Sequence, residues 1–447
     1  MMTLSNKTNY TDIDKKREKI TFLIVALIFI LGLITIIFRP QTYISFIGYT
    51  SVLILFIICV FLGRKEKYLF NPYYLFLITP FSLFIYTVNV SPYYLTEISS
   101  TTWLISVYNI AMFIGGLWLV TKFSRNRSNP ELLQQNASLV HNPSVLSLHA
   151  YITLMIGMTP VLFGLISGFQ TFLDGDLIGI KEYMVAMPLA SIFSLFKYLS
   201  ITFAMKSKRK VTILIVMCFC LFSVFMNISK FEIMIFVIAI LISYIKYFTI
   251  SRKTKFVFVI LFLLSAVAIY LSFEYFDVLR GYNTANDLIL KGRFNKEINE
   301  GFVLPYMYLT TPWVNLQYVM ETNTFHTYGL WLMKPFLGYL QIDGELIRQY
   351  TLTARSSFNT FTFITVFFKD FGLIGSGFMT LFLGGITGRI YTRFKYSNNS
   401  YIVAIYSLNA MAIAMMFFSN HYLMLSYPIT IILITGVYKL LFRKRNN

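Results

Sequence analysis

The sequence consists largely of apolar runs of about 20 residues, the length that an α-helix needs to cross the hydrocarbon core of a bilayer. Short polar connectors separate most of these runs. This spacing predicts an all-α polytopic membrane protein with about twelve transmembrane helices. The expected spans are residues 20–38, 43–62, 69–89, 101–121, 146–168, 188–205, 211–228, 231–248, 256–274, 373–392, 401–419 and 422–442.

The composition excludes a soluble protein. Hydrophobic residues make up 57% of the 447 residues and charged residues only 13%, whereas a soluble chain carries roughly 25% charged residues. A single soluble core cannot hide this much apolar surface. The first apolar run, 20–38, is long enough to span, and no small-residue cleavage site follows it. We therefore expect a membrane helix there and not a cleaved signal peptide.

The distribution of charge sets the expected orientation. The net charge is +19, but the Lys and Arg residues lie in short clusters between apolar runs, which is typical of membrane topology and not of nucleic-acid binding. With the N-terminus inside, 24 of the 38 Lys and Arg residues fall in cytoplasmic segments and 11 in outer ones. Seven of those 11 belong to one long loop, which translocates regardless of charge. The sequence therefore predicts an N-in/C-in protein.

Two connectors are longer than the others. Residues 122–145 form a polar linker rich in Asn, Ser and Gln, which predicts an N-terminal four-span unit at 1–121 and an eight-span catalytic unit at 146–447. The outer segment 275–356 has 82 residues, seven of them basic and seven acidic. Long ordered loops usually carry function, so we expect the functional site on the outer face.

Parts of the outer segment are predicted to be interfacial helices. Residues 301–318 and 329–339 mix aromatic residues and Leu with few charges, and Trp313 and Trp331 would anchor them at the membrane surface. The next stretch, 358–368, is apolar but short, and we interpret it as a re-entrant or interfacial piece. The expected architecture, with its large outer loop, is GT-C-like.

Basic residues near the outer face are candidates for binding an anionic ligand. Lys230 lies in the tight turn between the seventh and eighth spans, where its ammonium could bind a lipid headgroup or simply snorkel to the surface. Arg280 follows the ninth span, and its guanidinium could bind a phosphate or pair with Asp277. Four more, of which some are expected to be ordinary solvated charges, are Arg293, Lys334, Arg348 and Arg355.

Two outer residues are candidates for accepting a proton. His326 lies in the long loop, where an imidazole can act as a base or serve as polar surface. Asp370 lies near membrane depth, where acidic residues are costly and often functional. Its alternative role is that of a carboxylate stabilising a helix N-terminus. In the following span, Gly384 and Gly388 have the small-xxx-small spacing that lets helices pack closely.

Neither a metal nor a cofactor is expected. No clustered carboxylates stand at ligand spacing, and no phosphate-binding GxxxxGK[ST] pattern occurs. The three cysteines, Cys59, Cys218 and Cys220, fall inside apolar spans without nearby His or acidic partners. They therefore indicate neither a disulfide framework nor a metal site.

One sequence pattern before the last three spans is more specific than the rest. Asn359-Thr360-Phe361-Thr362 is followed by Asp370-Phe371-Gly372-Leu373-Ile374-Gly375. Together with the basic residue in the tight turn, Lys230, the later Arg280 and the large outer loop, this pattern resembles the Wzy-type oligosaccharide repeat-unit polymerases that build O-antigen or capsule. The resemblance covers most of spans 5 to 12. Many relatives carry Arg at the position of Lys230, and Lys supplies the charge without the planar fork.

The resemblance implies a glycosyltransferase of the cytoplasmic membrane whose active site faces the periplasm or the exterior. An acceptor hydroxyl of one lipid-linked repeat unit would attack the anomeric carbon of a glycan held on undecaprenyl pyrophosphate, which would leave. The expected partners are that lipid-linked oligosaccharide, the bilayer, and a chain-length regulator and flippase of the same pathway, but no nucleic acid.

The resemblance also gives the candidate residues roles. Lys230, Arg280, Arg348 and Arg355 would bind the pyrophosphate, and Arg280 would also stabilise the charge that develops on it as it leaves. His326 or Asp370 would accept the proton of the acceptor. Asn359, Thr360 and Gly372 belong to the motif itself.

Other classes of membrane protein stay open. A lipid-linked oligosaccharide flippase would also have about twelve spans, but its loops would be short and evenly spread. An O-antigen ligase would share the layout and the phosphate-binding arginines, and it would differ in its acceptor. A secondary transporter should show paired repeats and interrupted helices at the midplane, which the late outer loop does not resemble.

Overall fold

A computed structural model of the chain describes residues 43–66, 68–87, 98–127, 142–187, 189–227, 230–248, 300–322, 326–339, 360–419 and 429–436. These residues form α-helices and no strand, so the predicted all-α class is confirmed for the described part of the chain. Predicted spans 20–38 and 256–274, and most of 422–442, lie outside the described residues.

The helices follow the apolar runs of the sequence. They are α2 (Tyr43–Arg64), α3 (Pro72–Phe76), α4 (Ile78–Thr87), α5 (Ser100–Arg127), α7 (Pro143–Ser167), α8 (Phe169–Leu173), α9 (Leu177–Ala186), α10 (Ala190–Ser207), α11 (Lys210–Asn227), α12 (Lys230–Tyr247), α15 (Glu300–Thr322), α16 (Leu330–Tyr339), α18 (Phe363–Tyr396) and α19 (Ser400–Ala414).

Within the described ranges, four helices are long and apolar enough to cross a bilayer, namely α5, α7, α11 and α18. A fifth would be the pair formed by α9 and α10, which meet at a bend of 101°. These helices support an α-helical membrane protein. The number of twelve spans and the N-in/C-in orientation stay predictions.

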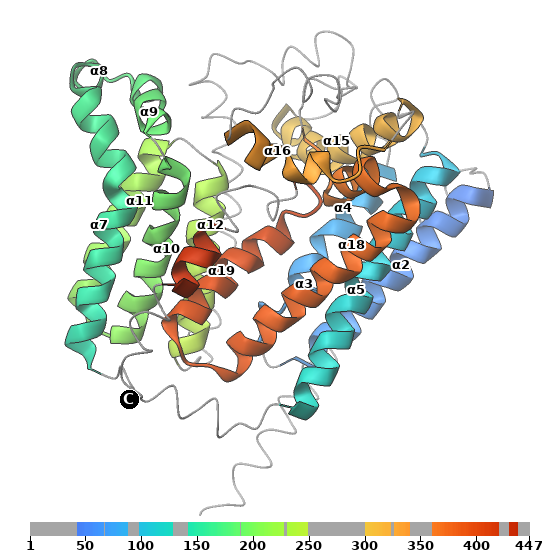
Figure 1. Cartoon of the computed structure of the whole chain (residues 1–447), viewed down its shortest axis with the longest axis horizontal. Coiled ribbons are helices and arrows are strands. Elements are labelled where there is room, and N and C mark those ends of the chain that lie inside the picture. Colours follow the sequence, from blue (N-terminus) through green and yellow to red (C-terminus); the bar gives the residue numbers. More distant parts are fainter. Residues whose placement is uncertain are drawn as a thin grey trace, which may run out of the picture.

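The helices pack into two groups (Figure 1). Helices α2 to α5 share one apolar core with α15 and α18, and α7 shares a second core with α9 to α12. Helices α15 and α16 lie at one end of the molecule, at the top of Figure 1. The N-terminal helices thus pack against helices from the far end of the sequence, and the division of the chain at residues 122–145 stays a prediction.

Helix α19 joins the two groups because it is buried on all sides. Tyr406 and Ile413 belong to the first core, whereas Leu408 and Met411 belong to the second. The Tyr406 ring stacks on Phe394 of α18 with 4.2 Å between the ring centroids. A helix that is apolar around its whole circumference is suited to such a central position.

Small residues set the distance between α5 and α18. A Cβ added at Gly116 of α5 would overlap the carbonyl oxygen of Leu381 in α18. On the other side, a Cβ at Gly384 would overlap the carbonyl oxygen of Phe113, and one at Gly388 would lie 3.1 Å from the carbonyl oxygen of Leu117. The close packing predicted for Gly384 and Gly388 is therefore confirmed.

Hydrogen bonds between side chains cross the same interface. The Asn109 amide of α5 donates to the Ser376 hydroxyl of α18 over 3.2 Å, and the Thr380 hydroxyl donates to the Asn109 carbonyl oxygen over 2.8 Å. All three side chains are buried. Because lipid offers no partners, such bonds fix the register of the two helices.

Two expectations from the sequence were wrong in detail. Run 69–89 is broken at Leu77 into α3 and α4, because Pro80 has no N–H to donate and its ring crowds the carbonyl of Phe76. Trp313 is no surface anchor, because it is fully buried and its indole N–H donates to the Ser82 hydroxyl of α4 over 3.0 Å. Residues 169–187, which separate two predicted spans, form α8 and α9.

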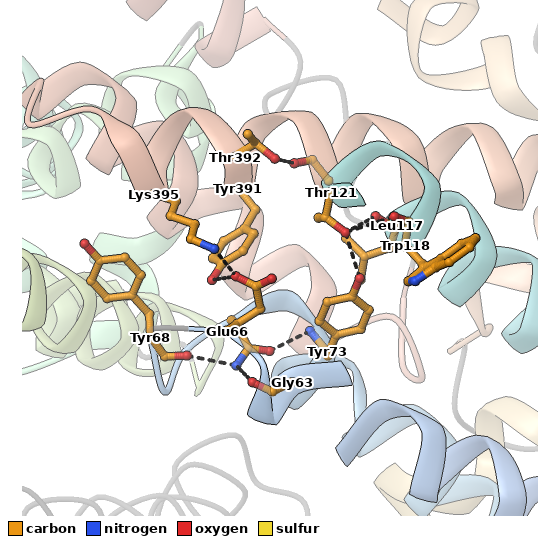
Figure 2. A network of polar contacts seen from close by, with 12 residues as sticks. Gly63, Glu66, Tyr68, Tyr73, Leu117, Trp118, Thr121, Tyr391, Thr392 and Lys395 are labelled. Atoms are coloured by element: carbon orange, nitrogen blue, oxygen red, sulfur yellow. Dashed lines mark hydrogen bonds and ion pairs between the residues drawn. The ribbon is translucent and has the colours of Figure 1, made fainter. Parts of the chain in front are cut away.

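The turn between α2 and α3 is attached to the end of α18 (Figure 2). The Glu66 carboxylate lies 2.7 Å from the Lys395 ammonium and accepts a hydrogen bond from the Tyr391 hydroxyl at 3.0 Å. Asn71 holds the turn itself, because its amide donates to the carbonyls of Gly63 and Tyr68. The predicted topology places this cluster on the cytoplasmic side.

Lys246 in the last turn of α12 binds the same end of α18. Its ammonium donates to the carbonyl oxygens of Phe394 over 2.7 Å and Lys395 over 3.4 Å. A cation near the C-terminal carbonyls of a helix is favoured by the helix dipole. Lys246 also donates to the hydroxyl of Tyr68, and burial raises the pKa of that hydroxyl. The two helix groups are therefore joined at this end by polar contacts as well as by α19.

Two adjacent glycines of α5 test the packing against α18. We expect Gly116→Ala to destabilise the protein by about 1–3 kcal/mol, because its methyl group would meet a backbone carbonyl that cannot move freely. Gly115→Ala is the matched control, since its Cβ would lie 3.9 Å from the nearest atom, a side-chain carbon of Leu381. Thermal unfolding in detergent should show a lower midpoint for Gly116→Ala alone. Equal midpoints would contradict the close approach.

Candidate functional site

The predicted motif lies at a break in α18. The helix starts at Phe363 after Thr362, and at Gly372 its backbone leaves the helical conformation, with φ 66° and ψ −164°. Glycine adopts this positive φ without the steric cost that other residues meet. The apolar piece predicted at 358–368 is thus a short helical segment before the break, and the long predicted span follows it.

Asp370, two residues before the break, caps a different helix. Its buried carboxylate accepts hydrogen bonds from the backbone N–H groups of Trp331 (3.0 Å) and Leu332 (2.8 Å), in the first turn of α16. The Thr327 hydroxyl donates to the same carboxylate. The carboxylate therefore satisfies donors of the α16 N-terminus that have no partner within their own helix. This geometry agrees with the second role predicted for Asp370, that of a carboxylate at a helix N-terminus. The helix that it caps, however, is α16 and not the span that follows Asp370.

Backbone contacts reinforce this attachment. The N–H of Thr327 donates to the Lys369 carbonyl over 3.1 Å, and the N–H of Tyr328 donates to the Asp370 carbonyl over 2.9 Å. The segment that leads into α16 is therefore bound to α18 through both backbone and side chain.

His326 lies directly against the break. A Cβ added at Gly372 would lie 2.8 Å from Nε2 of His326, and the Phe368 ring meets the imidazole edge-on with 5.9 Å between centroids. In the part of the chain that the structure describes, the buried Nδ1 of His326 has no hydrogen-bond partner. The structure thus brings three predicted residues together, namely His326, Asp370 and Gly372.

Thr360 connects the start of α18 to α15. Its carbonyl oxygen accepts a hydrogen bond of 2.8 Å from the Asn315 side-chain amide of α15. The motif therefore contacts both described helices of the outer segment, α15 through Thr360 and α16 through Asp370. Asn359, the first residue of the motif, lies outside the described residues.

Six basic residues were candidates for binding an anionic ligand, four of them (Lys230, Arg280, Arg348 and Arg355) for the pyrophosphate, and this geometry does not place them. Lys230 is the first residue of α12 and Lys334 lies within α16, but their side chains are not described. The remaining four, Arg280, Arg293, Arg348 and Arg355, lie outside the described residues. Their grouping around one ligand stays a prediction.

Sequence reasoning missed a buried ion pair between α10 and α12. The Lys197 ammonium lies 2.5 Å from Oε2 of Glu232, with exposed side-chain fractions of 0% and 13%. It also donates to the Ser223 hydroxyl of α11 over 3.0 Å, and the Tyr198 hydroxyl donates to Oε2 of Glu232. A lysine inside a predicted span is a signal for a functional or structural site, but the sequence did not identify its partner.

Among the described residues, no group of three or more His, Cys, Asp or Glu side chains is placed to hold a metal ion. No family model, no curated protein and no solved structure matches the chain.

Removing the Asp370 carboxylate should loosen α16. We expect Asp370→Ala to cost about 1–3 kcal/mol of stability, because two backbone N–H groups and a buried hydroxyl lose their acceptor. Hydrogen exchange should increase at Trp331 and Leu332. Asp370→Asn, which keeps one carbonyl oxygen, should show a smaller increase. Unchanged exchange in both variants would contradict the capping role.

Proposed function

We propose that this protein polymerises undecaprenyl-pyrophosphate-linked oligosaccharide repeat units into a surface polysaccharide. The reaction is a metal-independent glycosyl transfer at the outer face of the cytoplasmic membrane. The proposed protein has about twelve spans in an N-in/C-in arrangement, with a GT-C-like architecture. Capsule and O-antigen are both products of this type.

The motif at residues 359–375 is the observation that carries the proposal. It supplies the most specific part of the resemblance to repeat-unit polymerases. Its residues Thr360 and Asp370 bind α15 and α16, the two described helices of the long outer segment. This arrangement supports the proposal that the motif orders the outer loop and thereby positions the basic residues that would bind the substrate.

The proposed reaction assigns the residues as follows. The acceptor hydroxyl attacks the anomeric carbon of the donor glycan, and undecaprenyl pyrophosphate leaves. Cations stabilise the charge on the leaving pyrophosphate, and for this we propose Lys230, Arg280, Arg348 and Arg355. A nearby group takes the acceptor proton, for which His326 and Asp370 are the candidates from the sequence.

The first experiment is the glycan profile of cells that lack this protein. A gel would show the polysaccharide ladder, and lipid-linked intermediates would be extracted in parallel. Loss of the ladder with accumulation of single repeat units supports the polymerase. Lipid-linked repeat units retained on the cytoplasmic face would instead indicate a flippase. Lipid-linked polymer that is not transferred to its final acceptor would indicate a ligase.

A variant of Arg280 tests the proposed pyrophosphate binding. We expect Arg280→Ala to insert and fold normally but to reduce polymer by about 100-fold or more, because removal of a single donor that stabilises transition-state charge costs about that much. Lys296→Ala in the same loop is the control, since it removes the same charge and should leave the ladder intact. A normal ladder in Arg280→Ala would reject this role.

A further inference from the structure

The proposed reaction needs a proton acceptor, and the two sequence candidates have contacts that limit them in this role. Both oxygens of the Asp370 carboxylate accept backbone hydrogen bonds from α16. The His326 ring packs against Gly372 and Phe368. We therefore propose, resting on the function above, that Glu232 accepts the proton of the acceptor hydroxyl, and that Lys197 and Tyr198 position its carboxylate.

Among the described residues, the contacts of the Glu232 carboxylate all involve one of its two oxygens. Oε2 accepts from the Lys197 ammonium and the Tyr198 hydroxyl, whereas no described residue donates to Oε1. Lys197 is completely buried, but 13% of the Glu232 side chain is exposed. In the described part of the chain, the arrangement thus fixes the carboxylate through Oε2, while Oε1 receives no hydrogen bond and part of the side chain is exposed.

The position of Glu232 in the fold agrees with this role. It lies in the first turn of α12, two residues after Lys230, and therefore only about 3 Å further along the helix axis. The last turn of α12 binds the C-terminal end of α18 through Lys246, whereas the first segment of α18 binds α16. The first turn of α12 accordingly lies toward the end of the molecule that carries α15 and α16 (Figure 1).

A further polar contact holds the Lys197–Glu232 pair. The Ser223 hydroxyl of α11 accepts a hydrogen bond of 3.0 Å from the Lys197 ammonium. Because Lys197 is completely buried, its charge is costly unless it is paired and hydrogen-bonded. Glu232 and Ser223 supply these contacts, and the Tyr198 hydroxyl donates to Oε2 of Glu232.

The proton transfer completes the balance of the proposed step. The acceptor oxygen forms a bond to the anomeric carbon, and its proton passes to Oε1 of Glu232. The bond between the anomeric carbon and the pyrophosphate oxygen breaks, and the electron pair leaves with undecaprenyl pyrophosphate. Glu232 then releases its proton to water at the outer face and is ionised for the next cycle.

The test uses the purified full-length protein in liposomes, supplied with lipid-linked repeat units extracted from cells that lack it. We expect Glu232→Gln to lower kcat by about 10²–10⁴-fold, the usual contribution of a general base, with little change in KM. Glu232→Asp should retain part of the activity.

Three further variants separate the possible explanations. Glu182→Gln on α9 is the control, because that side chain is exposed and should tolerate the change. Glu232→Gln alone leaves a buried, unpaired lysine, which could prevent folding. The double variant Lys197→Met/Glu232→Gln removes both charges and therefore tests the role of Glu232 in that case as well. The double variant should be as inactive as the single one. His326→Gln tests the competing base, because loss of catalysis in this variant with Glu232→Gln active would assign the proton to His326.

Three results would overturn this inference while the polymerase assignment stands. The first is wild-type kcat in Glu232→Gln or in the double variant. The second is loss of catalysis in His326→Gln with Glu232→Gln active. The third is failure of both Glu232→Gln and the double variant to fold, which would assign the pair a structural role. If the wild-type protein itself does not join repeat units, the proposed function is wrong, whatever the Glu232 variants show.

Discussion

A polar side chain between helices in a bilayer has no water to bind, so its partner must come from another part of the protein. This constraint determines which helices of the described chain are neighbours. Lys197 of α10 reaches Glu232 of α12, Asn109 of α5 reaches Ser376 and Thr380 of α18, and Lys246 of α12 reaches the last carbonyls of α18. Apolar packing alone would allow helices to slide or rotate against one another, whereas each of these contacts is satisfied in one arrangement only. Glycines add to this effect, because Gly116 and Gly384 let the backbones of α5 and α18 approach closely.

The same constraint shapes the outer end, where an irregular backbone is needed. The helix break at Gly372 exposes backbone groups, and the surrounding residues use them. Asp370 accepts from the first turn of α16, and the carbonyls of Lys369 and Asp370 accept from Thr327 and Tyr328. A motif that resembles a catalytic signature thus has a clear structural task in this chain. In the proposed polymerase, that task would be to hold the outer loop over the membrane-embedded helices, while the chemistry depends on cations of the loop and on a carboxylate in the first turn of α12.

The helices themselves were largely predictable, because a run of about 20 apolar residues has few alternatives to a membrane helix. The predicted helices at 301–318 and 329–339 correspond to α15 and α16. The errors arose where the environment of a residue matters more than its type. Trp313 was predicted to be a surface anchor because tryptophan is common at membrane interfaces, but it is buried and donates to Ser82. The candidate site was predictable in part: the sequence singled out His326 and the motif residues Asp370 and Gly372, but it did not indicate that His326 lies against Gly372 or that Asp370 caps α16.

By itself, the sequence determined the class of protein, the positions of most helices and the expected orientation, because hydrophobic length, proline and the distribution of Lys and Arg act locally along the chain. Only the tertiary structure decided which helix Asp370 caps, that Lys197 pairs with Glu232, and that α19 is buried between two groups of helices. These features join residues that are far apart in the sequence. Their partners depend on how the helices rotate and pack, and the apolar pattern of a buried helix, which is similar on all its faces, carries little information about that rotation.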